Sequence, residues 1–370
     1  MTVSESEPDL AMNMSPNVGV SIALRDTALQ HKPRPLPLFL DLLRSETAAS
    51  PERTAAALSG LQAYQKAERR SAPPPKPVVA EKGRARLFDY GGDGPAAVFI
   101  PSLINPPTIL DLAEDNSLLR WLSEHGVHPY LVDWGMPHPN EAELTVANHV
   151  ETLLLPLIDA VDEPVHLVGY CLGGTMATAA ATLRPPLSLV TMAAPWRFDG
   201  FSDEARDGLK MLWDNAQPTA RDIGALPMEV LQTGFWKLDP ARTVGKFEMF
   251  GRLDPASDKA RAFVALEDWA NDGPPLTYGA GRELIEELFC GNATGRGQWT
   301  VGGQTIDPAA LPCPTLDIVS SSDRIVPEAS AARVGKVITV SQGHVGMVVG
   351  GRGKIALWEP LAQWLSQVQH

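Results

Sequence analysis

The segment Gly169-Tyr170-Cys171-Leu172-Gly173-Gly174 constrains the fold of this 370-residue chain more than any other. A short apolar run, residues 165–168, precedes it and an alanine-rich run, residues 175–183, follows it, so the sequence predicts a strand that passes directly into a helix. Gly169 and Gly173 then stand where a Cβ would clash in the tight turn, and Cys171 stands at its tip. This spacing is typical of a nucleophile elbow, although a buried cysteine beside a glycine-rich turn would share it.

An acid and then a histidine follow in the order that such an elbow requires, each after a predicted strand. The apolar run 316–320 ends shortly before Asp323, and the run 337–340 ends shortly before His344, which glycines flank. We therefore predict a catalytic triad in which Cys171 is the nucleophile, His344 is the base and Asp323 orients the histidine.

Other acids and histidines fit these roles less well. Asp317 lies within a strand pattern, where a carboxylate would need a buried partner. His31 and the terminal His370 lie in segments expected to be too loose for a catalytic geometry. Five further histidines lie in helical, loop or strand-interior stretches and are expected to be structural: His125, His128, His138, His149 and His166.

Strand and helix patterns alternate from Arg86 onward, which predicts an α/β fold with a mostly parallel central sheet. Residues 1–80 are predicted to hold a tail, two short helices at 37–43 and 51–66, and a proline-rich linker at 71–77. The core is expected in residues 81–198 and 312–370, and a helical cap without repeated strand patterns in residues 199–311. Predicted core strands cover 87–90, 97–101, 128–133, 165–168, 316–320 and 337–340, and predicted core helices cover 117–125, 145–161 and 175–183.

Charge and composition exclude several classes of protein. A formal net charge of −13 without a long basic run argues against a nucleic-acid partner. No apolar stretch reaches the roughly 18 residues of a membrane span, and the N-terminus lacks a signal-peptide pattern, so we expect no transmembrane segment and a cytoplasmic protein. Three cysteines do not suit a disulfide framework, and Cys290 and Cys313 are expected to be packing residues.

Several ordered blocks between about residues 97 and 350 resemble the polyhydroxyalkanoate synthase family, especially the catalytic subunit of its short, two-subunit type. The blocks cover residues 99–105 with 109–112, 130–135, 169–175, 192–195, 267–269, 322–327 and 343–346. Residues 1–80 have no counterpart in that pattern. The resemblance implies an α/β-hydrolase fold, Cys171 as the acyl-carrying nucleophile, His344 as base and Asp323 as the third member.

The resemblance also implies the substrates and surroundings of the reaction. These are a 3-hydroxyacyl-CoA thioester, which releases CoA, and the growing polyester, with no bound cofactor and no metal. Family members of this type act with a helical partner subunit, so such a partner, a homodimer and a place at the surface of polyester granules all stay open. CoA-contacting residues are not identified: Arg252, Arg282 and Arg324 are candidates for phosphate contacts, but exposed surface charge is the simpler interpretation of each.

A cysteine nucleophile suits acyl transfer, because attack on a thioester forms another thioester that keeps its transfer potential. The backbone amides of Leu172 and of Leu103, in the Ser102–Leu103 loop, are expected to stabilise the tetrahedral oxyanion. Two alternatives remain at this stage. One is a depolymerase or acyl thioester hydrolase on the same scaffold, and the other is a non-catalytic granule-associated protein.

Overall fold

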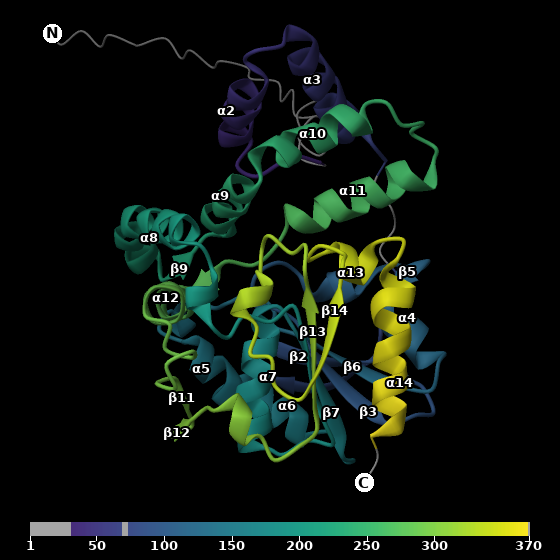
Figure 1. Ribbon diagram of the computed structural model, residues 1–370, viewed down its shortest axis with the longest axis vertical. Coiled ribbons are helices and arrows are strands. Elements are labelled where there is room, and N and C mark those ends of the chain that lie inside the picture. The colour runs from purple at the N-terminus through teal and green to yellow at the C-terminus, as the bar shows by residue number, and fades with distance from the viewer. Residues whose placement is uncertain (1–30, 69–72, 369–370) are drawn as a thin grey trace, which may run out of the picture.

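The computed structural model describes residues 31–68 and 73–368, and its central element is a twisted sheet (Figure 1). Within these residues one eight-stranded sheet has the order β1-β2-β6-β3-β7-β8-β13-β14. From β6 to β14 neighbouring strands run parallel, whereas β2 is antiparallel to both β1 and β6. The strands are β1 Val78–Lys82, β2 Ala85–Asp89, β3 Ala96–Ile100, β6 His128–Asp133, β7 Val165–Tyr170, β8 Leu189–Met192, β13 Thr315–Ser320 and β14 Lys336–Val340.

The central strands are buried on both faces, which explains their continuous apolar sequence. In β3, Val98 and Ile100 pack into one core cluster, while Ala97 and Phe99 pack into the cluster on the opposite face. Alternation of this kind follows from the two-residue period of a strand. The sheet is therefore the middle layer of three. The loops described below follow the carboxyl ends of its parallel strands.

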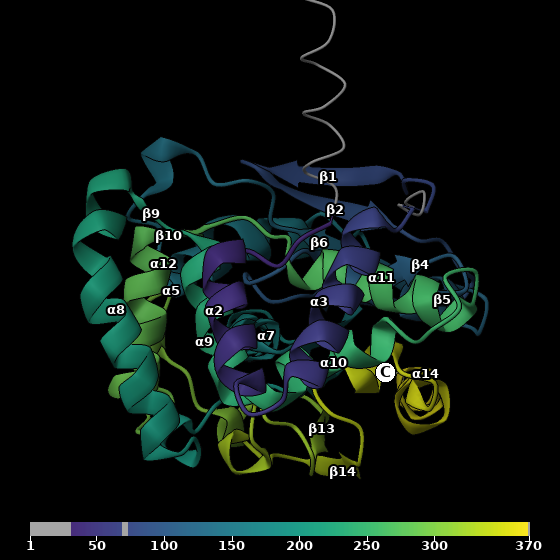
Figure 2. The ribbon, with the colours of Figure 1, turned by 90° about the horizontal axis from the view of Figure 1, so that it is seen from above.

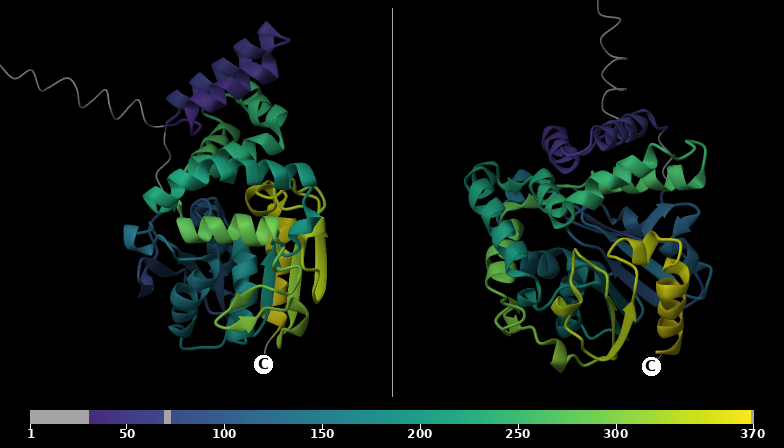
Figure 3. Two further views of the ribbon diagram at one scale, coloured as in Figure 1. Left: turned by 90° about the vertical axis from the view of Figure 1, so that its left-hand side faces the viewer. Right: turned by 45° about the horizontal axis from the view of Figure 1, so that its top comes forward.

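Helices cover both faces of the sheet (Figures 1 and 3). One face carries α5 Val146–His149, α6 Leu155–Asp159 and α7 Leu172–Leu183. The opposite face carries α4 Leu118–Ser123, α13 Gly346–Val349 and α14 Glu359–Gln367. The chain between α5 and α6, Val150–Leu154, is π-helical, so the predicted helix 145–161 is continuous but not regular.

A further helical layer lies above the sheet in Figure 1 and comes forward in Figure 2. It consists of α8 Asp203–Ile223, α9 Met228–Leu238, α10 Pro240–Phe250 and α11 Asp258–Ala270. We call α9, α10 and α11 the cap helices. Short strands of two or three residues lie between or beside these helices and near the sheet. They pair as β4 Asp111–Ala113 with β5 Asn116–Ser117, β9 Ala225–Leu226 with β10 Leu276–Thr277, and β11 Thr300–Val301 with β12 Gln304–Thr305. From α12 Tyr278–Arg282 onward the chain packs into the same core cluster as the sheet, through residues such as Leu284 and Trp299.

The N-terminal helices α2 Leu36–Thr47 and α3 Pro51–Lys66 pack on α10 (Figure 3). Their shared core is aromatic: Phe39 and Tyr64 meet the Phe247 ring edge-on, with centroid separations of 5.1 and 5.8 Å. His31 is 3 % exposed and its Nδ1 lies 2.6 Å from an oxygen of Asp268. The expectation that His31 lies in a loose segment was therefore wrong, because α11 supplies a polar partner for it.

Most predicted elements occur within a few residues of their expected bounds, but one strand was not predicted and the expectation for one cysteine was wrong. The strand 78–82 was not predicted, because its mostly exposed residues have no apolar alternation. Cys290 is exposed rather than a packing residue, whereas Cys313 is partly buried. His370 and part of the predicted linker, residues 71–72, lie outside the described residues.

Candidate active site

Cys171 occupies a sharp turn between the central strand β7 and helix α7. Tyr170 ends the strand and Leu172 begins the helix, so one residue makes the whole connection. Cys171 has φ 55° and ψ −133°, a conformation that non-glycine residues rarely adopt. Two backbone hydrogen bonds hold it there: its N–H donates to Met192 O at 3.0 Å, and its carbonyl accepts from Gly174 N–H at 2.8 Å. The predicted elbow is therefore present, with the thiol at its tip.

Close backbone approach explains the two predicted elbow glycines. A Cβ on Gly169 would lie 2.4 Å from Gly174 Cα, and a Cβ on Gly173 would lie 2.1 Å from Ile100 O. Both distances are below any real Cβ contact, so only glycine fits. Gly173 thereby brings the elbow against the end of β3, where the loop containing Leu103 begins.

Asp323 and His344 meet in the loops that follow β13 and β14. His344 Nδ1 lies 2.7 Å from Asp323 Oδ2, and the two residues are 7 and 8 % exposed. The other oxygen of Asp323 accepts from the backbone N–H groups of Ile325 at 2.8 Å and Val326 at 2.9 Å. These bonds fix the orientation of the carboxylate, which in turn fixes the imidazole ring with Nδ1 as donor.

Asp323 and Cys171 both influence the protonation of the His344 imidazole. Burial alone would lower the pKa of His344, but the negative charges of Asp323 and of a Cys171 thiolate, together with hydrogen bonds to both side chains, raise its pKa to about 10. Because Cys171 is one of the groups that raise the pKa of His344, the structure brings together all three residues that the sequence singled out. The arrangement permits proton exchange between the thiol and an oriented imidazole.

Tyr170 is a site residue that the sequence reasoning missed. Its ring stacks on the imidazole of His344, with centroids 5.0 Å apart and planes 28° apart, and its hydroxyl donates to the His344 carbonyl at 3.2 Å. Burial, with the charges of Cys171 and Asp323, raises the pKa of Tyr170 well above its ordinary value, so the phenol stays neutral. The two-residue period of a strand could have indicated the direction of the Tyr170 side chain, because it places Tyr170 on the same face of the sheet as Val168.

The two predicted oxyanion donors lie on either side of the contact between the elbow and β3. Within the described residues, the backbone N–H groups of Leu103 and Leu172 donate to no protein acceptor, although both side chains are buried. Leu172 begins α7, where backbone N–H groups have no partner within the helix. Ser102 Oγ accepts from Ile104 N–H at 3.0 Å and shapes the turn that contains Leu103. Unpaired, preorganised amides are what an oxyanion needs.

The rival candidates have structural partners elsewhere. Asp317 lies inside β13 and accepts from Thr191 Oγ1 at 2.9 Å and from Arg333 N–H at 2.8 Å. His149 lies 2.7 Å from a guanidinium nitrogen of Arg84, and burial is the main reason that its pKa falls to about 4. His166 Nδ1 lies 2.8 Å from Ser188 Oγ within the strand layer. None of these groups belongs to the arrangement around Cys171.

The candidate phosphate-contacting arginines lie apart from one another. Arg324 forms a 2.6 Å ion pair with Asp239 at the start of α10, and its side chain is 66 % exposed. Arg252 is exposed and Arg282 is partly buried at the end of α12. The structure gathers no basic pocket from these three residues.

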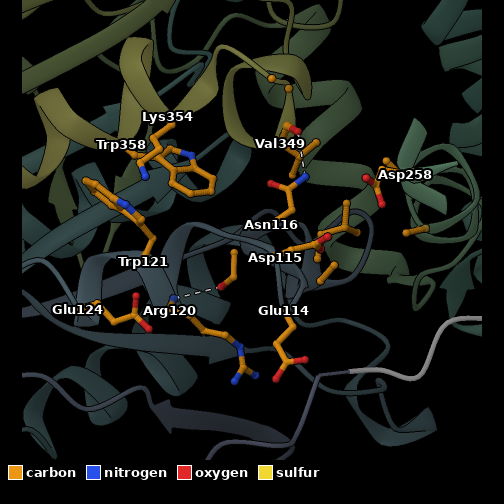
Figure 4. A pocket seen from close by; sticks show the side chains of 17 residues that line it. Glu114, Asp115, Asn116, Arg120, Trp121, Glu124, Asp258, Val349, Lys354 and Trp358 are labelled. Atoms are coloured by element: carbon orange, nitrogen blue, oxygen red, sulfur yellow. Dashed lines mark hydrogen bonds between the residues drawn. The ribbon is translucent and has the colours of Figure 1, made fainter. Parts of the chain in front are cut away.

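A cavity of about 420 Å³ opens between the β4–β5 hairpin, α4, α11 and residues 349–358 (Figure 4). Its cationic side chains are already engaged: Arg120 pairs with Asp111 at 2.7 Å, and Lys354 lies over the Trp121 ring at 5.5 Å. The remaining charged residues that line it are acidic: Glu114, Asp115, Glu124 and Asp258. This lining does not favour a polyanion such as the nucleotide part of CoA, and no residue of the predicted triad lines the cavity.

Two features are absent from the described residues. No group of three or more histidine, cysteine, aspartate or glutamate side chains in residues 31–68 and 73–368 is arranged to hold a metal ion. In the same part of the chain, no helix combines the length and the apolar character that a membrane crossing requires.

Comparison with known proteins gives two consistent results. A family profile described as "Alpha/beta hydrolase family" matches residues 97–351, which confirms the predicted fold class together with the mostly parallel sheet. Several relatives named "Poly(3-hydroxyalkanoate) polymerase subunit PhaC" are similar over most of the chain, which confirms the resemblance that the sequence blocks indicated.

Three of these relatives differ in length. The protein from Haloferax mediterranei is 29 % identical over 320 residues, which cover 79 % of this chain and 64 % of that protein. The protein from Allochromatium vinosum is 28 % identical over 324 residues, covering 79 % of this chain and 88 % of that one. The protein from Synechocystis sp. is 27 % identical over 354 residues, covering 88 and 93 %. The aligned region thus spans less than two thirds of the Haloferax protein.

Proposed function

Since the chain belongs to the alpha/beta hydrolase family, we propose that it is an acyltransferase that polymerises 3-hydroxyacyl groups from CoA thioesters into polyhydroxyalkanoate and releases CoA. The observation that carries the proposal is the thiol of Cys171 at the tip of the elbow, beside the buried pair of His344 and Asp323, which are 2.7 Å apart. Similarity to relatives named as poly(3-hydroxyalkanoate) polymerase subunits supports the choice of substrate.

In the first half-reaction the sulfur of Cys171 attacks the thioester carbonyl, and His344 takes the thiol proton. The amides of Leu103 and Leu172 stabilise the oxyanion. When the tetrahedral intermediate collapses, the bond to the CoA sulfur breaks and His344 returns the proton to that sulfur. The acyl group is then held on Cys171 as a thioester, and free CoA departs.

In the second half-reaction the hydroxyl of another 3-hydroxyacyl group attacks the Cys171 thioester. His344 takes the hydroxyl proton, an ester bond forms, and the Cys171 sulfur leaves and recovers the proton. Asp323 keeps the imidazole in the required tautomer throughout, since its carboxylate accepts from Nδ1. Repetition lengthens the polyester by one unit per cycle.

A cysteine is suited to this sequence because the enzyme-bound thioester keeps most of the transfer potential of the CoA thioester. Water would compete with the hydroxyl as acceptor, so the cap helices and the low exposure of His344, 7 %, favour transfer over hydrolysis. If water did reach the acyl group, the same residues would act as an acyl thioester hydrolase or depolymerase.

The proposal is tested by release of free CoA from 3-hydroxybutyryl-CoA with the purified chain, followed by analysis of the product. We expect release that Cys171→Ala abolishes and that yields a polyester. Cys313→Ala is the matched control, since it removes a partly buried thiol outside the elbow and should leave release unchanged. Release that yields only free hydroxy acid would make the chain a hydrolase, and release that survives in Cys171→Ala would refute the nucleophile.

We further propose that the polymerising enzyme works at the surface of the polyester granule, because its product is insoluble and grows from the active site. The chain alone, the chain with a helical partner subunit and a homodimer are separate possibilities for the active form. Sedimentation of the purified chain before and after addition of 3-hydroxybutyryl-CoA distinguishes the monomer from the homodimer by mass and detects association with polymer.

A further inference from the structure

Helix α11 of the cap is attached to the loop that carries Leu103. Trp269, near the end of α11, donates its indole N–H to the carbonyl of Pro106 at 2.8 Å. Asn105, in the same loop, donates its side-chain amide to the carbonyls of Asp272 at 3.1 Å and Ala270 at 3.4 Å. The end of α11 and the loop after β3 therefore share three hydrogen bonds, across more than 160 positions of sequence.

Backbone geometry fits this attachment. Asn105 has φ 64°, in the left-handed region where asparagine is among the tolerated residues. Gly273 has φ 151°, and a Cβ there would lie 3.1 Å from Asn105 Cα, so the two backbones touch. This close contact leaves the loop little freedom while α11 is in place.

The start of the same loop is attached to the core of the protein instead of the cap. The indole N–H of Trp134, just after β6, donates to Pro101 O at 3.1 Å, and Gly173 of the elbow packs against the same carbonyl. Leu103 lies between the two attachments. Its backbone amide is thus positioned from the core on one side and from the cap on the other.

We propose that Trp269 and Asn105 are positioning residues that hold the Leu103 amide in place for the oxyanion, so that the oxyanion site is complete only while α11 rests on this loop. The inference rests on the proposed acyl transfer and extends it. An oxyanion donor must sit within a few tenths of an ångström of its optimum, and displacement by about 1 Å can cost about 10²-fold in rate. A loop of irregular structure does not hold such a position by itself.

The contacts of the residues next to Trp269 explain why α11 can hold the oxyanion loop in a fixed position. Glu267 pairs with Lys246 of α10 at 2.7 Å, and Asp268 accepts from the Tyr64 hydroxyl of α3 at 2.8 Å. The block Glu267-Asp268-Trp269 thus ties α11 to another cap helix, to the N-terminal helices and to the oxyanion loop. Each of its three residues has a separate structural partner.

Trp269→Phe tests the assignment, because it keeps an aromatic side chain and removes the N–H donor; the loss of ring volume is matched by the control variant described below. Two reactions of Cys171 are compared. One is single-turnover CoA release from 3-hydroxybutyryl-CoA, which forms an oxyanion, and the other is alkylation by iodoacetamide, which does not. We expect acylation to fall about 10- to 100-fold while alkylation stays within about twofold of wild type. In the steady state kcat should fall more than KM changes.

Trp358→Phe is the matched control, since Trp358 also donates its indole N–H to a backbone carbonyl, Val348 O, at 2.9 Å. That bond lies outside the oxyanion loop, so both reactions should keep their wild-type rates. Asn105→Asp is the second test variant, because aspartate tolerates the same backbone conformation but cannot donate to the cap carbonyls. It should reproduce the selective loss of acylation.

Two results would overturn the assignment. Equal losses of acylation and alkylation in Trp269→Phe would place its effect on the nucleophile or on access to it. Wild-type acylation in both folded test variants would show that the loop needs no support from the cap. A wild-type protein that is alkylated at Cys171 but never acylated refutes the proposed function itself, and the two failures are therefore distinguishable.

Discussion

Replacing Asp323 with asparagine separates the shape of this side chain from its charge. One oxygen of Asp323 accepts from the N–H groups of Ile325 and Val326, at 2.8 and 2.9 Å, and the amide oxygen of asparagine can accept both bonds. The amide NH₂ then takes the place of the oxygen that lies 2.7 Å from His344 Nδ1. Two donors cannot face each other, so the imidazole must carry its proton on Nε2 and cannot take the proton of Cys171.

The magnitude can be estimated in two ways. The pKa of His344 is about 10, which reflects burial that lowers it and the charges of Asp323 and Cys171 that raise it more. Relative to an ordinary value near 6.5, this net shift corresponds to about 5 kcal/mol in favour of the imidazolium, and the charge of Asp323 is the largest of the contributions that raise it. The same aspartate-to-asparagine exchange in a serine protease lowers kcat about 10⁴-fold, which also corresponds to about 5 kcal/mol. We therefore expect CoA release to fall by about four orders of magnitude.

The assay is single-turnover CoA release from 3-hydroxybutyryl-CoA at several pH values, with circular dichroism to confirm the fold. Asp317→Asn is the matched control: this carboxylate is also buried and lies within β13, but it bonds Thr191 and Arg333 instead of His344. It should change stability more than rate. A folded Asp323→Asn protein that keeps more than about a tenth of the wild-type rate would refute the tautomer argument.

Three further predictions concern stability and the histidine. Gly173→Ala should lower the free energy of unfolding by about 2 kcal/mol or more, because its Cβ would lie 2.1 Å from Ile100 O. At Gly343 the nearest atom to an added Cβ lies at 3.8 Å, so Gly343→Ala should lower the free energy of unfolding by less than about 0.5 kcal/mol. Urea unfolding compares the two variants, and equal losses would contradict the close approach at Gly173. Tyr170→Phe keeps the ring on His344 but loses the 3.2 Å hydrogen bond to the His344 carbonyl. The free energy of unfolding should therefore fall by about 1 kcal/mol in the same assay, and an unchanged urea midpoint would count against that bond. Because the pKa of His344 in the fold, about 10, lies above its ordinary value, its stabilising effect is fully present below about pH 6.5 and is lost as pH rises through about 10. The wild-type protein should therefore lose stability over that range more steeply than His344→Gln, and parallel pH profiles would be inconsistent with the raised pKa.

The order and spacing of strands made much of the candidate site predictable. Asp323 and His344 each follow a parallel strand, and the carboxyl ends of parallel strands meet at one edge of a sheet. The sharp turn from strand to helix made the elbow glycines predictable, and Gly169 is indeed required by contact with Gly174. The contact that requires Gly173 is with Ile100 of β3, which the sequence did not indicate. Helix α7 begins at Leu172, three residues earlier than expected, since the alanine-rich stretch understates the helical run that starts at the elbow.

Contacts between distant segments were not predictable in the same way. The bond from Trp269 to Pro106 spans 163 positions, and no periodic pattern indicates which carbonyl an indole N–H will reach. The buried position of His31 depends on Asp268 of α11, so its own segment gives no sign of order. Cys290 lies in an amphipathic π-helical stretch, and the sequence alone does not reveal that it lies on the exposed side.

The cap is attached on both sides of the candidate site, but with unequal strength. On the side of the acid loop, Arg324 pairs with Asp239 of α10, and a pair whose arginine is 66 % exposed contributes about 0–1 kcal/mol. On the side of the oxyanion loop, Trp269 and Asn105 share three hydrogen bonds with the backbone, and Gly273 touches Asn105 closely. Separating the cap from the acid loop therefore costs less free energy than separating it from the oxyanion loop. We therefore expect any opening of the cap to occur on the weaker side, where Trp269 stays in place and the Leu103 amide keeps its position.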